Sequence, residues 1–155
     1  MKANRVHAYG SPAVIIFEEI PIPEPGKGEV LVHVKASGVG PWDGWIRTGK
    51  SVLPQPLPLT LGSDFSGTVA AMGEGVDDCE PGDDVFGVTN RQFTGANAEY
   101  AVAKAAMLAP KPRRLGHIDA ASIPVVAVTA WQMLFDHARV APGQRVLILG
   151  AAGNV

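Results

Sequence analysis

The sequence has a single cysteine, Cys79, and no excess of basic residues. One cysteine excludes an internal disulfide bond and favours a reducing compartment. Thirteen Lys and Arg against fifteen Asp and Glu give a net charge of −2, so no basic surface is available to attract nucleic acid or an anionic membrane. The uncharged stretch Ala120–Phe135 is shorter than the ~20 residues of a membrane span. We therefore expect a cytoplasmic protein that binds neither nucleic acid nor membranes.

Glycine and proline are abundant and interrupt the chain at short intervals. The 18 Gly and 13 Pro separate short apolar runs, a pattern typical of many strands joined by turns. Six segments before Leu115 read as strands: Met1–Tyr9, Ala13–Glu19, Glu29–Ser37, Gly62–Ala71, Asp83–Val88 and Ala98–Ala103. The turn Gly10-Ser11-Pro12 between the first two predicts a hairpin. So many short strands favour a sheet that closes on itself, because closure removes unpaired edges. We predict a mainly β fold, a partly closed β-barrel, over residues 1–115.

The pattern changes after Leu115. Val125–His137 has apolar residues at helical spacing and predicts a helix. Arg145–Leu149 reads as a buried parallel strand, and it runs into the glycine-rich turn Gly150–Gly153. A dinucleotide-binding unit begins in this way, with the pyrophosphate seated on backbone amides. We therefore expect residues 116–155 to hold a linker helix and the first strand of a truncated dinucleotide-binding domain.

Seven short motifs follow one another along the chain. They are ASGVGPWDGWIRTG (Ala36–Gly49), LGSDFSGTV (Leu61–Val69), PGDDVFG (Pro81–Gly87), AEY (Ala98–Tyr100), LAPKP (Leu108–Pro112), VTAWQMLF (Val128–Phe135) and GQRVLILGAAGNV (Gly143–Val155). In this order they resemble the N-terminal half of the medium-chain dehydrogenase/reductase superfamily, and within it the zinc-independent quinone oxidoreductases. The resemblance implies a GroES-like catalytic domain at residues 1–115 and the start of a Rossmann domain at residues 116–155.

The resemblance assigns the glycine-rich turn and one threonine to the coenzyme. Gly150, Ala151, Ala152, Gly153, Asn154 and Val155 would hold the pyrophosphate, and Thr129 would lie beside the nicotinamide. From the residues alone, an ordinary Gly-Ala turn and a Thr129 hydroxyl bonded one helical turn back stay open. The family favours NADP(H). NAD(H) stays open as well, because the residue that selects between the two lies ~20 residues beyond the loop.

The residues that would bind zinc are missing from the expected positions. Zinc-dependent members of the superfamily carry a cysteine and a Gly-His-Glu triplet where this chain has Gly40-Pro41 and Gly62-Ser63-Asp64. One cysteine and four scattered histidines (His7, His33, His117 and His137) do not form a tetrahedral site. We therefore expect no zinc. Without a Lewis acid the alkoxide from a simple ketone is poorly stabilised, whereas hydride addition to a quinone or enone delocalises the charge.

By resemblance, two segments line the substrate cleft. Its residues are Gly40, Pro41, Trp42, Asp43 and Trp45 from the first segment, and Ser63 and Asp64 from the second. The two tryptophans suit stacking on a flat acceptor, although aromatics at these positions could equally pack the barrel wall. Asp43 suits a proton relay, but we expect an exposed loop aspartate. Ser63 and Asp64 lie on the cleft floor or form an Asx-type turn.

These observations lead to one hypothesis and two alternatives. The hypothesis is the N-terminal portion of a zinc-free NAD(P)H-dependent oxidoreductase that transfers hydride to a quinone or another conjugated carbonyl. The alternatives are an enoyl reductase or zinc-less alcohol dehydrogenase of the same superfamily, and a non-catalytic, stand-alone GroES-like module. We expect the 155 residues alone to be inactive, because the helix after the glycine-rich turn is missing. An uncovered strand at Val146–Leu149 would favour a homo-oligomer.

Overall fold

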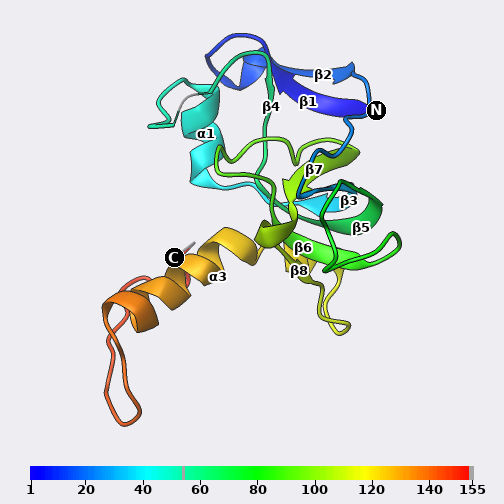
Figure 1. Ribbon diagram of the computed structural model, residues 1–155. Helices are drawn as coiled ribbons and strands as arrows, with labels where there is room; N and C mark the ends of the chain where they lie inside the picture. Colours follow the sequence, from blue (N-terminus) through cyan, green and yellow to red (C-terminus); the bar gives the residue numbers. More distant parts are fainter. Residues whose placement is uncertain (54, 154–155) are drawn as a thin grey trace.

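The predicted hairpin at the start of the chain forms the centre of a small antiparallel sheet. The computed structural model describes residues 1–53 and 55–153. Strand β1 (Lys2–Val6) pairs with β2 (Ile15–Glu19) across the short 3₁₀ helix η1 (Pro12–Val14), and on its other side with β4 (Leu59–Thr60). The order of this sheet is β2-β1-β4 (Figure 1). The hairpin prediction is confirmed.

The remaining strands form a larger antiparallel sheet in the order β7-β3-β5-β6-β8. Its strands are β3 (Glu29–Ser37), β5 (Asp64–Met72), β6 (Asp84–Val88), β7 (Tyr100–Lys104) and β8 (Leu108–Pro110), with the 3₁₀ helix η2 (Ala105–Met107) before β8. The mainly β prediction is confirmed. Within the described residues the two sheets do not close into a full barrel, which agrees with the prediction of a partly closed one; the isolated bridge between Ala3 and Ala98 links them.

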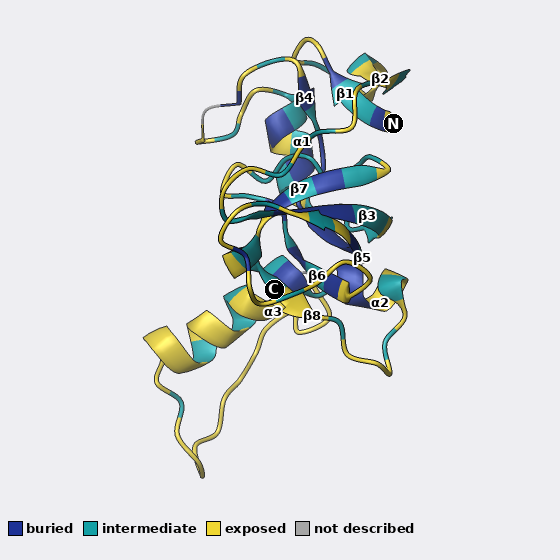
Figure 2. Ribbon diagram, turned by 45° about the vertical axis from the view of Figure 1, so that its right-hand side comes forward, coloured by how far each residue is buried: buried dark blue, intermediate teal, exposed yellow. Residues whose placement is uncertain are grey.

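Two apolar clusters form the core. The larger one lies on the five-stranded sheet and consists of Val30, Val32, Phe65, Val69, Val76, Val85, Ala96 and Ala103. The smaller one joins Ile46 to Val6, Leu59 and Leu61, so that helix α1 (Pro41–Arg47) packs on the small sheet. Figure 2 shows that burial is concentrated in the strands and in parts of α1 and α2. Helix α1 has proline at its first position, and it contains Asp43, which was expected to lie in a loop.

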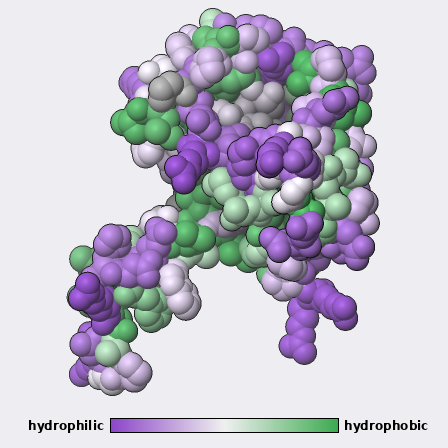
Figure 3. All heavy atoms as spheres, viewed as in Figure 1, coloured by the Kyte–Doolittle hydropathy of each residue, from purple (hydrophilic) through white to green (hydrophobic). Residues whose placement is uncertain are grey.

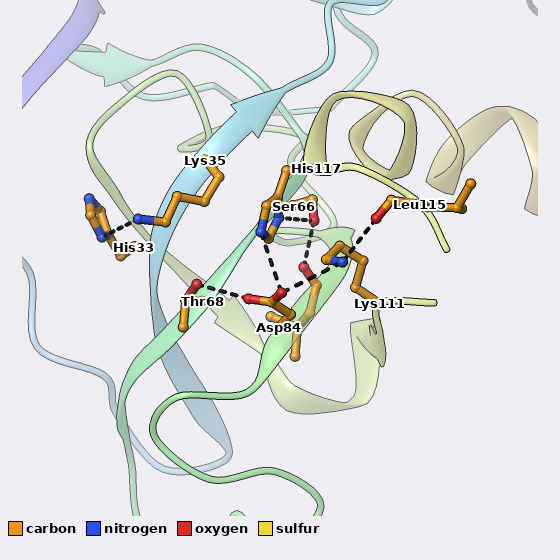
Figure 4. Close-up of polar contacts among 9 residues, drawn as sticks. His33, Lys35, Ser66, Thr68, Asp84, Lys111, Leu115 and His117 are labelled. Carbon is orange, nitrogen blue, oxygen red and sulfur yellow. Dashed lines mark hydrogen bonds and ion pairs between the residues drawn. The ribbon is translucent and has the colours of Figure 1, made fainter. Parts of the chain in front are cut away.

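Helix α2 (His117–Ala121) packs against β3, β5 and β6. A polar cluster fastens it there (Figure 4). The imidazole Nδ1 of His117 lies 2.8 Å from the Ser66 hydroxyl, and its Nε2 lies 3.5 Å from Asp84 Oδ2. Thr68 donates to the other Asp84 oxygen at 3.0 Å, and Lys111 Nζ lies 3.6 Å from Asp84 Oδ2. The connection from β8 to α2 is thus held to the sheet by charge and hydrogen bonds.

The C-terminal helix projects from the β-rich body (Figure 1). Helix α3 (Pro124–Trp131) continues into the π-helix η3 (Gln132–His137), so the predicted helix over Val125–His137 is confirmed. Its apolar side chains Val128, Trp131, Met133 and Phe135 are exposed. Apolar surface gathers where this extension leaves the body (Figure 3). Within the described ranges, no helix has the length and apolar character needed to cross a bilayer.

The predicted strand at Arg145–Leu149 is wrong. Residues 145–148 have no regular secondary structure, and the exposed fractions of Val146 to Leu149 run from 49% to 86%. A parallel strand needs a neighbouring strand to complete its hydrogen bonds, and none lies beside this segment in the part of the chain that the structure describes. The turn at residues 149–153 does form, with the Gly153 amide donating to the Gly150 carbonyl at 2.8 Å.

The close approach of β3 and β5 yields a prediction about Gly67. A methyl group there would overlap the His33 carbonyl oxygen and the Val32 side chain. We expect Gly67→Ala to lower the free energy of unfolding by about 1–3 kcal/mol, measured by urea denaturation. The control is Gly44→Ala in α1, where a new methyl group has no neighbour within 4 Å. The control should be neutral or stabilising by about 0.5–1 kcal/mol, and equal losses in both variants would contradict the close approach.

The Asp84 cluster predicts a pH-dependent contribution to stability. Burial raises the pKa of Asp84, but Thr68, His117 and Lys111 outweigh it, so the pKa lies below its ordinary 3.8. A lowered pKa means stabilisation that is present above the unfolded value and lost as the pH falls through the folded value. We expect Asp84→Asn to cost about 1 kcal/mol at neutral pH, because the pairs are half-exposed. In urea titrations this difference should shrink as the pH falls below 3.8 and through the lowered pKa of the folded state; a difference that stays constant as the carboxyl group is protonated would contradict the cluster.

Candidate functional site

Asp43 lies in the first turn of α1 and is buried, with 6% of it exposed. Its Oδ2 accepts the Gly40 amide at 2.8 Å, and its Oδ1 accepts the Gly62 amide at 3.0 Å. Burial raises the pKa of Asp43 against these two hydrogen bonds, and the nearby charge of Asp64 adds to the rise. The expectation of an exposed loop aspartate was wrong, because the carboxylate joins the start of α1 to the segment that enters β5.

Trp42, Ser63 and Asp64 are linked by consecutive hydrogen bonds. The indole Nε1–H of Trp42 donates to Ser63 Oγ at 2.9 Å, and the Ser63 hydroxyl donates to Asp64 Oδ2 at 2.6 Å. The other oxygen of Asp64 accepts the Val125 amide of α3 at 2.8 Å. Ser63 and Asp64 are buried. Burial also raises the pKa of Asp64, opposed by the bonds from Ser63 and Val125. The predicted cleft residues 42, 63 and 64 thus meet.

A cavity of about 140 Å³ lies where these elements join. Its lining includes Gly40, Trp42, Asp64, Ala121 and Val126. A side chain at position 40 would overlap the Trp42 indole. The glycine is therefore required by the close approach of the aromatic ring, which sequence reasoning did not detect.

A larger groove of about 470 Å³ runs between α3 and the β6 and β8 strands. It is mainly apolar, and its lining includes Phe86, Phe93, Leu108, Val128 and Thr129. Thr129 donates its hydroxyl to the Val125 carbonyl at 2.7 Å, as the structural alternative for this residue predicted. This bond leaves the Thr129 oxygen able to accept a further hydrogen bond.

Phe93 connects the groove to the tryptophan, and sequence reasoning missed it. Its ring lies edge-on to Trp42, with centroids 5.9 Å apart and an interplanar angle of 66°. Its φ of 61° lies in the left-handed region, which is costly for a bulky residue and is concentrated at functional sites. A lone phenylalanine in a loop has no sequence pattern that could have identified it.

Several predicted site residues lie outside this constellation. Pro41 is exposed at the start of α1, and Trp45 is 57% exposed. The exposed residues Gly150, Ala151, Ala152 and Gly153 form the turn after η3, while Asn154 and Val155 lie outside the described residues. No hydrogen bond of the described residues joins that turn to Thr129 or Trp42. The assignment of this turn and of Thr129 to the coenzyme stays a prediction.

The described side chains contain no cluster of three or more His, Cys, Asp or Glu residues that could hold a metal ion. The resemblance places one set of zinc ligands at Gly62-Ser63-Asp64, and there both polar side chains bond to other groups of the chain. Asp64 accepts from Ser63 and Val125, and the Ser63 hydroxyl lies between Trp42 and Asp64.

The sequence and the fold of this chain are similar to those of known proteins. Residues 26–113 match the alcohol dehydrogenase GroES-like domain. Human quinone oxidoreductase is 36% identical over 156 aligned positions, covering 100% of this chain and 47% of that protein. The crystal structure of an alcohol dehydrogenase superfamily protein from Novosphingobium aromaticivorans superposes with a TM-score of 0.90 and 40% identity, over 99% of this chain and 47% of that chain. A mycobacterial protein complexed with NADPH superposes with a TM-score of 0.84 and 34% identity, over 92% and 43% of the two chains.

The chain belongs to the alcohol dehydrogenase GroES-like domain family. More particularly, it is a quinone oxidoreductase-like member of the medium-chain dehydrogenase/reductase superfamily, as the order of its motifs predicted. It spans about half the length of the relatives that it matches, with 47% of the human protein covered.

The bonds of Asp43 predict the effect of an isosteric change. Both carboxylate oxygens accept backbone N–H groups, so Asp43→Asn must turn its NH₂ toward one of these donors. Although the raised pKa shows that burial opposes the charge, the variant leaves a backbone amide without its acceptor. We expect a loss of about 1–3 kcal/mol in urea denaturation. The exposed Asp77→Asn serves as control and should stay within about 0.5 kcal/mol of the parent; equal behaviour of the two variants would refute the role of Asp43.

Proposed function

We propose that this chain forms the substrate side of an NAD(P)H-dependent oxidoreductase that reduces a quinone or another conjugated carbonyl. The observation that carries the proposal is the apolar groove of about 470 Å³ lined by Phe93 and Thr129. Its volume is in the range of small-molecule sites, and its walls are mainly aromatic and aliphatic, with the Thr129 hydroxyl and the Gln132 amide as polar side-chain groups. Such a site suits a flat, weakly polar acceptor. The quinone oxidoreductases among the chain's relatives support the same reading.

The aromatic side chains orient the acceptor in this proposal. Trp42 holds Phe93 edge-on, and Phe93 in turn presents its ring to the groove. Offset and edge-to-face contacts stabilise a stacked planar ligand by about 0.5–1.5 kcal/mol beyond the area that they bury. For Trp45, exposed on α1, the resemblance alone supports a place in the cleft. The chain therefore contributes positioning and exclusion of water rather than a covalent intermediate.

The proposed coenzyme is NADP(H), as in the mycobacterial relative solved with NADPH, and NAD(H) is the alternative. When bound, it supplies the hydride. Of this chain's residues, Thr129 is proposed to accept a hydrogen bond on the nicotinamide side, and Gly150–Gly153 to approach the pyrophosphate. Gly150 fits that role, since its φ is 76° and nothing lies within 4 Å of its side-chain position. An open backbone turn allows the close approach that a phosphate needs.

The proposed reaction is independent of zinc. The donors available near the groove are the Thr129 hydroxyl, the Gln132 side-chain amide and backbone groups. The two buried carboxylates are occupied by amides and a hydroxyl. Such donors stabilise developing charge weakly compared with a metal ion. Quinones and enones need less stabilisation, because conjugation spreads the charge. An enoyl reductase would use the same geometry, and the choice of acceptor distinguishes it.

The proposal predicts the behaviour of the complete protein that contains this chain. We expect the complete protein to oxidise NADPH when a quinone is present, measured as the loss of NADPH absorbance. EDTA should not change the rate. Phe93→Ala should lower kcat/KM for the quinone by about 10-fold, because it removes an aromatic contact worth about 1–1.5 kcal/mol. The exposed Ile118→Ala in α2 is the matched control and should leave the rate unchanged.

Three results would contradict the proposal. Loss of activity on chelation would identify a metal enzyme. Turnover of enoyl thioesters alone would favour the enoyl reductase. No oxidation of NADPH with any acceptor would favour the non-catalytic module.

A further inference from the structure

The hydrogen-bond chain through Ser63 has only one direction in which it can run. The indole Nε1–H of Trp42 and the Val125 amide can only donate, so the groups facing them must accept. Ser63 has one hydroxyl hydrogen. Since its oxygen accepts from Trp42, this hydrogen goes to Asp64 Oδ2, 2.6 Å away. The chain therefore runs from Trp42 through Ser63 to Asp64, and it meets α3 there.

Only a carboxylate satisfies both ends of this chain. Asp64 accepts from Ser63 on one oxygen and from Val125 on the other. An asparagine would turn its NH₂ toward one of the two donors. The chain would then reverse at Ser63 or break at Val125. Hydrogen bonds in such a chain polarise one another, so a change at one end weakens the other.

Asp64 is also the point at which the separate elements converge. Its backbone carbonyl accepts the Gly38 amide at 2.8 Å, just before α1. Its side chain reaches the second residue of α3, whose amide has no carbonyl one helical turn earlier to bond with. It is 5% exposed and lines the cavity of about 140 Å³ beside Trp42.

We propose that Asp64 is a positioning residue that couples Trp42 to the first turn of α3. The carboxylate fixes the start of the helix, and Thr129 lies one turn further along it. Ser63 fixes the Trp42 indole to the same carboxylate. The Asp64 side chain therefore fixes the position of the aromatic wall, formed by Trp42 and Phe93, relative to the helix that carries Thr129.

The catalytic consequence of this coupling rests on the proposed function. If the aromatic wall orients the acceptor and Thr129 faces the coenzyme, Asp64 sets the distance between the two reactants. Misplacement by about 1 Å can cost about 100-fold in rate. Asp64 acts through Trp42 and α3 and needs no contact with either reactant.

Amide exchange and indole resonances in the ¹⁵N-labelled 155-residue chain test the coupling without any ligand. We expect Asp64→Asn to move the Trp42 Nε1–H resonance, because its NH₂ can face Ser63 and reverse that bond. Asp64→Ala removes both acceptor oxygens and should raise the exchange rate of the Val125 amide by about 10-fold. Ser63→Ala does not touch Val125. It should still raise Val125 exchange about 2- to 5-fold, because Asp64 loses the bond that polarises and holds it.

Two controls separate coupling from loss of stability. Ser51→Ala removes a hydroxyl that accepts from the Leu53 amide in the loop after α1, and it should change neither signal. The Val69 amide, bonded to the Asp83 carbonyl at 2.8 Å, reports global unfolding and should keep its rate in Ser63→Ala. If Ser63→Ala moves the Trp42 signal and leaves Val125 exchange at the parent rate, the coupling is refuted. This holds even if Asp64→Asn does not fold.

Kinetics of the complete protein test the positioning role of Asp64 in catalysis. Ser63→Ala should lower kcat with a quinone about 10-fold while KM for NADPH changes less than about 2-fold. An unchanged kcat would refute the positioning role in catalysis. A complete protein that reduces no quinone would refute the proposed function, whereas the exchange data would still decide the coupling.

Discussion

Two buried carboxylates at the entry to β5 hold the different parts of this chain together. Asp43 joins α1 to Gly62, and Asp64 joins the same segment to Val125 in α3. Burial of a carboxylate is unfavourable unless hydrogen bonds replace the water that it loses. Here each oxygen accepts at least one such bond, although burial still raises the pKa of both groups. Because each carboxylate needs donors from two elements, the position of one element fixes the position of the other.

The contacts of Asp43 and Asp64 position the side chains of the candidate site. Trp42 reaches Ser63 with its indole N–H and Phe93 with its ring face, so one side chain belongs to both the polar chain and the aromatic wall. The groove beyond Phe93 is closed on one side by α3, whose outer apolar residues are exposed (Figure 3). An exposed apolar helix on an otherwise well-packed body is typical of a surface that another segment covers. The similarity to proteins about twice as long agrees with this pattern.

Elements with strong local patterns were predictable, and elements defined by distant contacts were not. The prediction for β3 matched its observed bounds, because alternation with period two is visible within nine residues. Helix α1 was missed, since Gly44 and two tryptophans obscure its periodicity. Its signals were nevertheless present, with Pro41 at the first helical position and Asp43 two residues later. The strand at Arg145–Leu149 was predicted from its apolar run and the glycine-rich turn that follows, but a strand also needs a neighbouring strand to complete its hydrogen bonds.

The sequence by itself determined the strand-rich character of the chain, the position of the C-terminal helix and the order of motifs that identifies the family. These properties depend on residues close together along the chain. Only the tertiary structure decided that Asp43 is buried, that Phe93 joins the site and that Asp64 accepts from both Ser63 and Val125. Trp42 and Ser63 are 21 positions apart, and Asp64 and Val125 are 61 apart. A polar side chain has no periodicity that reveals so distant a partner, and its burial depends on that partner being in place.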